Sequence, residues 1–367
     1  AYGGLTETPN IDALAGNGIR YNNFHTTALC SPSRASLLAG RNPHSIGLGS
    51  HALMAMGFPG YNGRVPMEAQ EVARLAQDKG WTTYALGKWD HTPGFQVHQV
   101  GPFTYWPTND GFDHTYTFKA PDANNFYPVM WAGHEPVEPA RGKADYHLST
   151  DLADKAIHYL TGHASIAPER PFFMFWAPSA MHAPHHAPPE FIEKYRGKFD
   201  MGWDKARKVI YKRQLEMGII PRDAVLTERM DQLPAWDSLS DDEKRMYARQ
   251  MEAFAGQLEH VDMEIGRMVA ALERIGKLDN TLIIVTSDNG ASGDGGLTGS
   301  HNEVLVINGQ QTALEENLKR LDEWGAEETN NHYHAGWAWA GNTPFKYFKQ
   351  AVHRGGIQDP LIVHWPA

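Results

Sequence analysis

The segment of residues 25–41, HTTALCSPSRASLLAGR, has the highest density of residues that can do chemistry. Ser31 and Pro32 suit the N-cap and first position of a helix that follows directly, which would place Cys30 beside a helix N-terminus. Unpaired backbone N–H groups there favour an anion, and Arg34 adds a permanent charge with a planar set of donors. The segment predicts a reactive position next to an anion site, although a lone cysteine by itself is more often a packed residue.

Two oxygen-bearing side chains follow the apolar run TLIIVT at residues 281–286. Asp288 and Asn289 stand next to each other on a predicted turn, and adjacent oxygen ligands of this kind suit Ca²⁺ or Mg²⁺. The same D-N-G sequence is also common in ordinary turns, which would need no metal.

The histidines of HAPHH and the lysine Lys88 are further candidate site residues. In HAPHH, His182 is followed by His185 and His186, which raises the alternative of a zinc cluster. The prolines keep this segment extended and no thiolate accompanies it, so zinc is the weaker interpretation. Lys88 ends a β-prone run.

The pattern of apolar residues predicts alternating helices and strands. A capping box at residues 240–243 precedes a long helix with one apolar stripe, and Val72, Leu75 and Ala76 share one face of a helix at 68–80. A third helix is expected at 149–160, with strands at 81–89, 171–177, 281–286 and 361–365. Residues 92–143 read as irregular loop, and 195–236 have no assigned structure.

This alternation predicts an α/β fold with a large, mainly parallel sheet sandwiched between helices, with ligands beyond the carboxyl ends of the strands. The chain has 367 residues, a formal charge of −10 and one cysteine. A single cysteine excludes an internal disulfide and a multi-thiolate zinc site, and the acidic balance argues against nucleic acid or an anionic membrane surface as a partner. No stretch reaches the roughly 18 apolar residues of a spanning helix.

The residues around Cys30 resemble the sulfatase motif C-x-P-S-R-x-x-x-L-x-G-R, here with Pro32, Ser33, Arg34, Leu38, Gly40 and Arg41. The resemblance runs from TPNID near the start to IVHWP at the end. It is strongest for bacterial arylsulfatase-type members, judging by HTTALCSPSR and by NHYHAGWAWAGNTPF at 331–345. It implies an alkaline phosphatase/sulfatase-like fold and conversion of Cys30 to formylglycine, an aldehyde hydrated to a geminal diol, by a formylglycine-generating or sulfatase-maturing enzyme.

The resemblance also implies roles for other residues. Asp288 and Asn289 match the family's D-N-G, so they and the modified Cys30 are expected to bind Ca²⁺ or Mg²⁺. His182 matches the histidine of H-x-P-x-x-x-P, which binds sulfate and is a candidate for protonating the leaving oxygen. Lys349, six positions before Gly355, matches a lysine that contacts the sulfate.

The family's G-K-W-H motif is altered in this chain. Lys88 matches its lysine, but Asp90 stands where the histidine is expected and His91 follows one place later. Neighbours in a strand point to opposite faces, so His91 is not a simple substitute unless the backbone bulges. Whether Asp90 or His91 takes the base role stays open.

The implied activity is hydrolysis of small sulfate esters of the arylsulfatase type. One diol oxygen, held with the help of Arg34, attacks sulfur, the alcohol or phenol leaves with help from His182 and Lys349, and the second hydroxyl expels sulfate. Residues 1–367 are expected to be one catalytic domain without the family's first metal-binding strand, which carries D-D-x-G, and without its C-terminal subdomain. The alternatives are a phosphonate or phosphate diester hydrolase on this scaffold and a non-catalytic anion-binding homologue.

Overall fold

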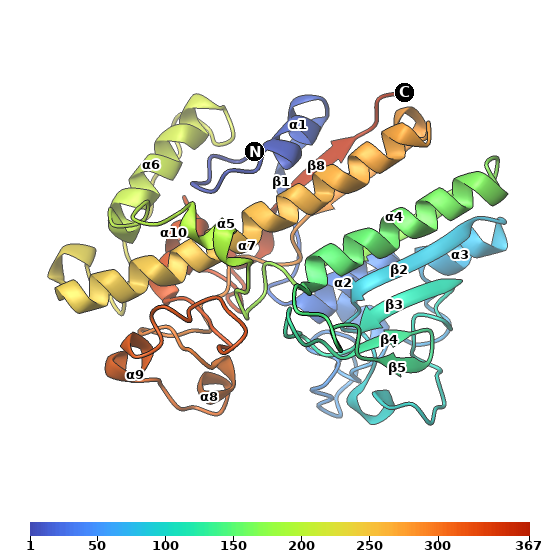
Figure 1. Cartoon of the computed structure of the whole chain (residues 1–367), viewed down its shortest axis with the longest axis horizontal. Helices are drawn as coiled ribbons and strands as arrows, with labels where there is room; N and C mark the ends of the chain where they lie inside the picture. The colour runs from blue at the N-terminus through green and yellow to red at the C-terminus, as the bar shows by residue number, and fades with distance from the viewer. The chain divides into compact units, whose positions relative to one another are not determined.

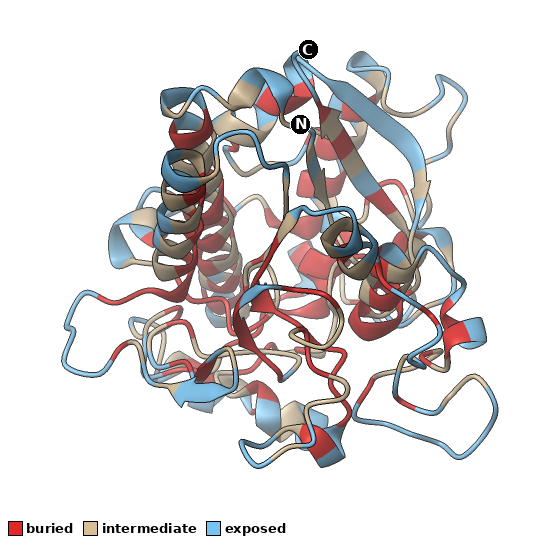
Figure 2. Cartoon of the chain, turned by 90° about the vertical axis from the view of Figure 1, so that its right-hand side faces the viewer, coloured by how far each residue is buried: buried red, intermediate tan, exposed pale blue.

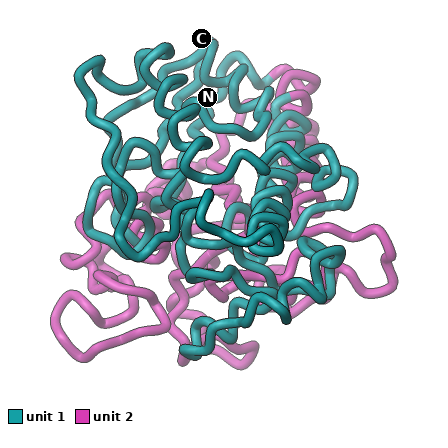
Figure 3. Tube along the Cα trace, turned by 90° about the vertical axis from the view of Figure 1, so that its left-hand side faces the viewer, with its two compact units in different colours: residues 1–28, 180–269, 277–367 teal, residues 29–179, 270–276 magenta.

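Helices and strands alternate along the chain in the structure, a computed structural model that describes residues 1–367 (Figure 1). The α/β class predicted from the sequence is confirmed. The backbone divides into two compact units, coloured separately in Figure 3. Unit 1 comprises residues 1–28, 180–269 and 277–367, and unit 2 comprises residues 29–179 and 270–276. No helix is both long and apolar enough to cross a membrane.

Unit 1 contains a three-stranded antiparallel sheet. Strand β8 (Gln358–His364) lies between β1 (Ile19–His25) and β7 (Ile283–Thr286). The helices of this unit are α1 (Pro9–Gly16), α5 (Pro189–Glu193), α6 (Gly202–Glu216), most of α7 (Asp241–Arg274), α8 (Glu303–Ile307), α9 (Leu314–Leu318), α10 (Ala335–Gly341) and α11 (Arg354–Ile357). Because β7 ends at Thr286, the segment that begins with Ser287 leaves from the end of a strand.

Unit 2 contains a five-stranded sheet in the order β5-β4-β3-β2-β6. Strand β2 (Thr82–Lys88) pairs in parallel with β3 (His114–Phe118) and β6 (Phe172–Ala177). The short strands β4 (Met130–Ala132) and β5 (Glu135–Val137) add to the sheet in antiparallel orientation. The helices of this unit are α2 (Cys30–Ala39), α3 (Val72–Asp78) and α4 (Leu148–Ile166).

The sheet arrangement differs from the predicted large, mainly parallel sheet. The strands are divided between an antiparallel sheet and a mixed one, and only the pairs that β2 makes are parallel. The run TLIIVT suggested a strand buried on both faces, but Leu282 and Ile284 are more than half exposed. The apolar run therefore predicted the position of β7 correctly, but it did not predict how the two faces of the strand are covered or how the strand pairs in its sheet.

Several element boundaries also correct the predictions. Residues 92–143 contain β3, β4 and β5 rather than loop alone, because short strands interrupted by Pro and Gly lack a visible period. The unassigned region 195–236 contains α6. Helix α3 is shorter than predicted and buries Ala73 instead of Val72 and Leu75, and α4 continues to Ile166.

The predicted capping box at the start of α7 is confirmed. The Ser240 N–H donates to Glu243 Oε2 at 2.7 Å, and the Glu243 N–H donates back to Ser240 Oγ at 3.3 Å. The helix that follows is 34 residues long, and stripe residues such as Tyr247 and Val261 are buried. The reciprocal hydrogen bonds satisfy N–H groups that the first turn would otherwise leave unpaired.

Aromatic side chains fill the core of unit 1. A cluster there includes Trp203, Trp236, Trp324, Trp337 and Trp339, and burial along the chain is coloured in Figure 2. Trp337 and Trp339 are thus core residues and do not line an open cleft. Large aromatic side chains are most often buried in this way.

The N-cap of α10 gives unit 1 a pH-dependent stability. His334 Nδ1 accepts a hydrogen bond from the Gly336 N–H at 2.8 Å, and its ring stacks on Trp203. Burial lowers the pKa of His334 from 6.5 to about 3. Below pH 6.5 the unfolded chain therefore binds a proton that the folded chain excludes until about pH 3, so the unfolding free energy falls as the pH drops through this window.

We expect His334→Asn to reduce this dependence, because asparagine can cap the helix but does not titrate. The slope of unfolding free energy against pH, measured by denaturant titration below pH 6.5, should decrease by up to about 1.4 kcal/mol per pH unit. The slope separates this effect from the loss of stacking, which is the same at every pH. An unchanged slope, equal to that of the exposed control His44→Asn, would contradict the assignment.

Candidate active site

Cys30 is the first residue of α2. Leu29 has an extended backbone and stands at the N-cap, so the helix begins earlier than the prediction with Ser31 at the N-cap. Pro32 is accommodated because it lies in the first turn, where its missing N–H costs no helical hydrogen bond. Cys30 is 1% exposed. Arg34, one turn further on, donates through Nη1 to the Lys88 carbonyl oxygen at 3.2 Å.

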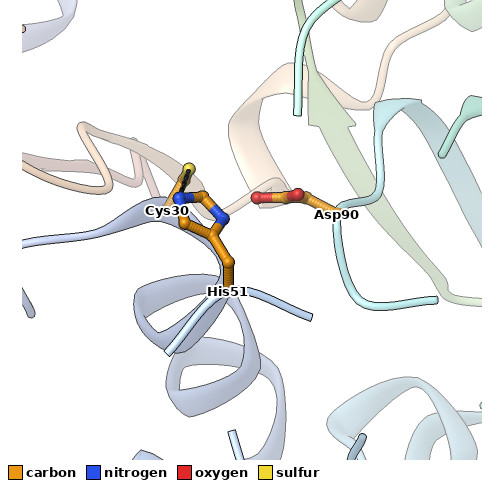
Figure 4. A group of neighbouring side chains, drawn as sticks. All are labelled: Cys30, His51 and Asp90. Carbon is orange, nitrogen blue, oxygen red and sulfur yellow. Dashed lines mark hydrogen bonds between the residues drawn. The ribbon is translucent and has the colours of Figure 1, made fainter. Parts of the chain in front are cut away.

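The side chain of Cys30 lies in a group with His51 and Asp90, which we call the Cys30 cluster (Figure 4). The sulfur, imidazole and carboxylate atoms all lie within 4.8 Å of one another, and Cys30 Sγ is 4.0 Å from His51 Nε2. His51 Nδ1 lies 3.1 Å from Ser31 Oγ, which also accepts a hydrogen bond from the Ala52 N–H. The segment that carries His51 is held beside α2 through the buried residues Ile46, Leu48 and Ala52, which cluster with Ala35.

Lys88 is the last residue of β2, and Asp90 of the Cys30 cluster follows two positions later. Lys88 Nζ is 3.8 Å from Asp90 Oδ2, and both side chains are 2% exposed. Asp90 has a backbone φ of 60°, a conformation uncommon for a residue other than glycine and often found at functional sites. Its Oδ2 is buried and has no hydrogen-bond partner. This carboxylate oxygen therefore has the Lys88 ammonium as its nearby charge and receives no hydrogen bond.

His91 is held by contacts outside the Cys30 cluster. Its Nδ1 is 2.6 Å from the Trp89 carbonyl oxygen, and its ring packs on the Trp89 ring at 4.8 Å between centroids. Burial lowers the pKa of His91 to about 4, so the ring is neutral near neutral pH. The structure thus groups Asp90, and not His91, with Cys30.

A second group, the Lys349 cluster, lies in unit 1 and consists of His182, Ser292, Asp294, His332 and Lys349. Lys349 Nζ is 3.2 Å from His182 Nε2 and 3.1 Å from Asp294 Oδ2. His182 Nδ1 lies 2.8 Å from the Ala183 carbonyl oxygen, to which it can only donate, so Nε2 of the neutral ring accepts from Lys349. The lysine is held in place because its own N–H donates to the Ala291 carbonyl oxygen.

Hydrogen bonds hold Asp294 in position beside the lysine. Ser292 Oγ donates to its Oδ2 at 2.8 Å, and Gln350 Nε2 donates to its Oδ1 at 2.8 Å. Burial would raise the pKa of Asp294, but the Lys349 ammonium, His332 and the hydrogen bonds from Ser292 and Lys349 together hold the pKa below its usual value. His332 Nε2 lies 2.9 Å from Ser292 Oγ, and burial lowers the pKa of this histidine to about 4. Ser292, Asp294 and His332 were not predicted from the sequence as site residues, because none of them belongs to a spacing pattern.

Asp288 and Asn289 leave the end of β7 beside the sheet. Asn289 Oδ1 is buried and has no hydrogen-bond partner. Burial raises the pKa of Asp359 in β8 to about 7, and the negative charge of Asp288 adds to that rise. An unsatisfied amide oxygen close to an excess of negative charge fits a hard divalent cation, which oxygen ligands prefer. Gly290 is needed here, since a Cβ would lie 1.9 Å from the Gly355 carbonyl oxygen.

The other two histidines of HAPHH are packed side chains. The ring of His185 stacks on Tyr333 at 4.7 Å between centroids, and His186 Nε2 lies 2.5 Å from the Thr329 carbonyl oxygen. Burial lowers the pKa of both. These contacts support an interior role and give the zinc interpretation no support.

Comparison with known proteins agrees with the motif around Cys30. The Sulfatase family model matches residues 1–367. An uncharacterized sulfatase of Schizosaccharomyces pombe is 31% identical, over 100% of this chain and 67% of its own length. An arylsulfatase of Klebsiella aerogenes is 24% identical, over 100% of this chain and 77% of its own length.

Solved structures share the fold. Ps i-CgsB in complex with k-i-k-neocarrahexaose superimposes with a TM-score of 0.61 at 22% identity, over 98% of this chain and 60% of that chain. The phosphonate monoester hydrolase of Agrobacterium radiobacter gives a TM-score of 0.53 at 17% identity, over 98% of this chain and 64% of that chain. This chain therefore corresponds to about two thirds of the length of such proteins.

The α/β fold, with a complete C-x-P-S-R motif opening a helix, defines an enzyme of the sulfuric ester hydrolase class. The chain belongs to the sulfatase family, whose model matches its whole length.

Proposed function

We propose that this protein hydrolyses sulfate esters through a formylglycine formed from Cys30. The observation that carries the proposal is the position of Cys30 at the start of α2, within the complete family motif, with an imidazole and a carboxylate beside its sulfur. Sγ marks where the oxygens of the modified side chain would lie. A maturing enzyme is required as a partner, because the unmodified chain carries only a thiol at this position.

The positively charged side chains of Arg34 and Lys88 are proposed to bind the sulfate group. Arg34 lies one helical turn after residue 30, and the Lys88 ammonium lies 3.8 Å from Asp90 of the Cys30 cluster. The transition state of sulfuryl transfer spreads negative charge over the sulfuryl oxygens. Preorganised cations stabilise that charge better than water does, because they need not reorient during the reaction. The positive field is therefore local, in a chain whose formal charge is −10.

We assign sulfate binding and protonation of the leaving oxygen to His182 and Lys349. The ammonium of Lys349 lies within hydrogen-bond distance of His182 Nε2, so a proton can pass from the lysine to the imidazole or directly to a leaving oxygen. The family resemblance assigns both clusters to one reaction.

Asp288 and Asn289 are the residues proposed to hold Ca²⁺ or Mg²⁺. When bound, the cation would neutralise charge on the sulfate oxygens. The buried and unsatisfied Oδ1 of Asn289 supports this assignment. That residue 30 is a further ligand stays a prediction from the family resemblance.

A direct test compares two substrates on protein produced together with a maturing enzyme. We expect kcat/KM for an aryl sulfate to exceed that for the matching aryl phosphonate monoester. A preference above about tenfold for the phosphonate would instead favour the hydrolase of the Agrobacterium type. Hydrolysis of neither ester, by protein that carries the aldehyde, would favour a non-catalytic anion-binding homologue.

The ion pair of Asp294 with Lys349 predicts a positioning role for the carboxylate. Asp294→Asn retains the shape of the side chain but removes the charge that fixes the ammonium, so we expect kcat/KM for an aryl sulfate to fall about tenfold. The exposed Asp279→Asn in the same unit serves as the control. Equal kcat/KM values for the two variants would show that Lys349 needs no such support.

A further inference from the structure

His51 is an unassigned imidazole beside the reactive residue. On the basis of the proposed function, we propose that His51 is a catalytic residue that removes the proton from the second hydroxyl of residue 30 and so releases sulfate. No motif identified His51 in the sequence. The inference comes from its side chain, whose Nε2 lies 4.0 Å from Cys30 Sγ and points toward it (Figure 4).

The surroundings of His51 suit a proton acceptor. Its Nδ1 lies 3.1 Å from Ser31 Oγ, which is held by the Ala52 N–H. When Nδ1–H donates to this oxygen, the lone pair of Nε2 faces the side chain of residue 30. The hydrogen bond at Nδ1 thereby fixes the imidazole, and Nε2 faces the side chain of residue 30.

The other candidates are less suitable. Asp90 also faces Cys30, but its carboxylate already pairs with the Lys88 ammonium, which lies 3.8 Å from Oδ2. Asp90 is better placed to stabilise the imidazolium that His51 becomes. His91 Nδ1 lies 2.6 Å from the Trp89 carbonyl oxygen and its ring packs on the Trp89 ring, and it is not one of the three side chains grouped around Cys30 Sγ. His51 thus supplies the imidazole that Asp90 replaces in G-K-W-H.

The proposed step balances without an added oxidant or reductant. After sulfuryl transfer, one carbon of residue 30 carries a hydroxyl and an oxygen bonded to sulfate. His51 Nε2 takes the hydroxyl proton, and the O–H electron pair becomes the second C–O bond of the aldehyde. The C–O bond to sulfate breaks, and its electron pair leaves with the sulfate dianion. Water then hydrates the aldehyde, and His51 returns its proton to solvent.

The test uses His51→Ala and His51→Gln in the full chain, produced with a maturing enzyme, and follows phenol release from an aryl sulfate. We expect one equivalent of phenol to appear at the wild-type rate, followed by turnover slower by about 10²-fold or more. The tryptic peptide of residues 21–34 from acid-quenched protein should carry an added SO₃ group. His44→Ala, an exposed histidine of the same segment, should behave as wild type.

The outcomes separate this inference from the proposed function. Aldehyde content, read from the same peptide, corrects each rate for maturation, and thermal melting checks that each variant is folded. Wild-type turnover in both His51 variants, without a sulfated peptide, overturns the role of His51 and leaves sulfate ester hydrolysis intact. Loss of the first equivalent of phenol also overturns it, because His51 would then act in sulfuryl transfer. Failure of the wild type to release phenol overturns the proposed function itself.

Discussion

Cys30→Ala is expected to lower kcat/KM for an aryl sulfate by about 10⁴-fold or more, because an alanine side chain cannot be converted to the aldehyde whose hydrate supplies the nucleophile. Cys30 is buried at the first position of α2, so the smaller side chain leaves only a local cavity and the variant should fold. Activity is measured by phenol release, with folding checked by thermal melting. The matched control is Ser36→Ala, a hydroxyl deletion nearly two turns further along the same helix, which should retain activity.

Cys30→Ser sharpens this prediction. A serine hydroxyl can accept the sulfuryl group, but the ester that results lacks the second hydroxyl needed to expel sulfate. We therefore expect at most one equivalent of phenol per chain and a sulfated protein. Multiple turnovers by either variant would contradict a nucleophile derived from Cys30.

Removal of divalent cations is expected to have the second largest effect. A chelator should reduce aryl sulfate hydrolysis by about 10²-fold, because an uncompensated sulfate charge is costly in a site that lacks its cation. Added Ca²⁺ or Mg²⁺ should restore the rate. Undiminished activity after exhaustive chelation would count against Asp288 and Asn289 as ligands.

A binding measurement separates the metal ligands from other effects of chelation. A cation that binds only the folded protein raises its melting temperature with concentration. We expect Ca²⁺ to raise the melting temperature of the chelated wild type and of Asp279→Asn, but to have little effect on Asp288→Asn. Equal shifts in all three would place the cation elsewhere.

The features predicted correctly from the sequence are those encoded by neighbouring residues. The capping box of α7 and the strands β2 and β6 depend on short stretches whose pattern is complete in itself. The motif around Cys30 is of the same kind, since its seven fixed residues all lie within residues 30–41. The start of this helix was nevertheless predicted too late, with Ser31 at the N-cap. The helix begins at Cys30, because the extended backbone of Leu29 provides the N-cap.

Features that depend on distant contacts were missed. His51 reaches Cys30 because a loop packs back on α2, and a single histidine in a Gly-rich loop has no period to reveal it. Asp294 meets Lys349 across 55 positions of sequence, through backbone pairing with Ala291. The strands β3 to β5 were also not predicted. They are short, so they are defined by pairing with neighbouring strands rather than by the propensity of their own residues.

The central claim is that residue 30 is not a cysteine in the working enzyme. Mass spectrometry of the tryptic peptide of residues 21–34, taken from protein that hydrolyses an aryl sulfate, tests it most directly. We expect the mass of the formylglycine peptide, as aldehyde or hydrate, in proportion to the specific activity. A peptide with an unmodified thiol at Cys30, in fully active protein, would contradict it.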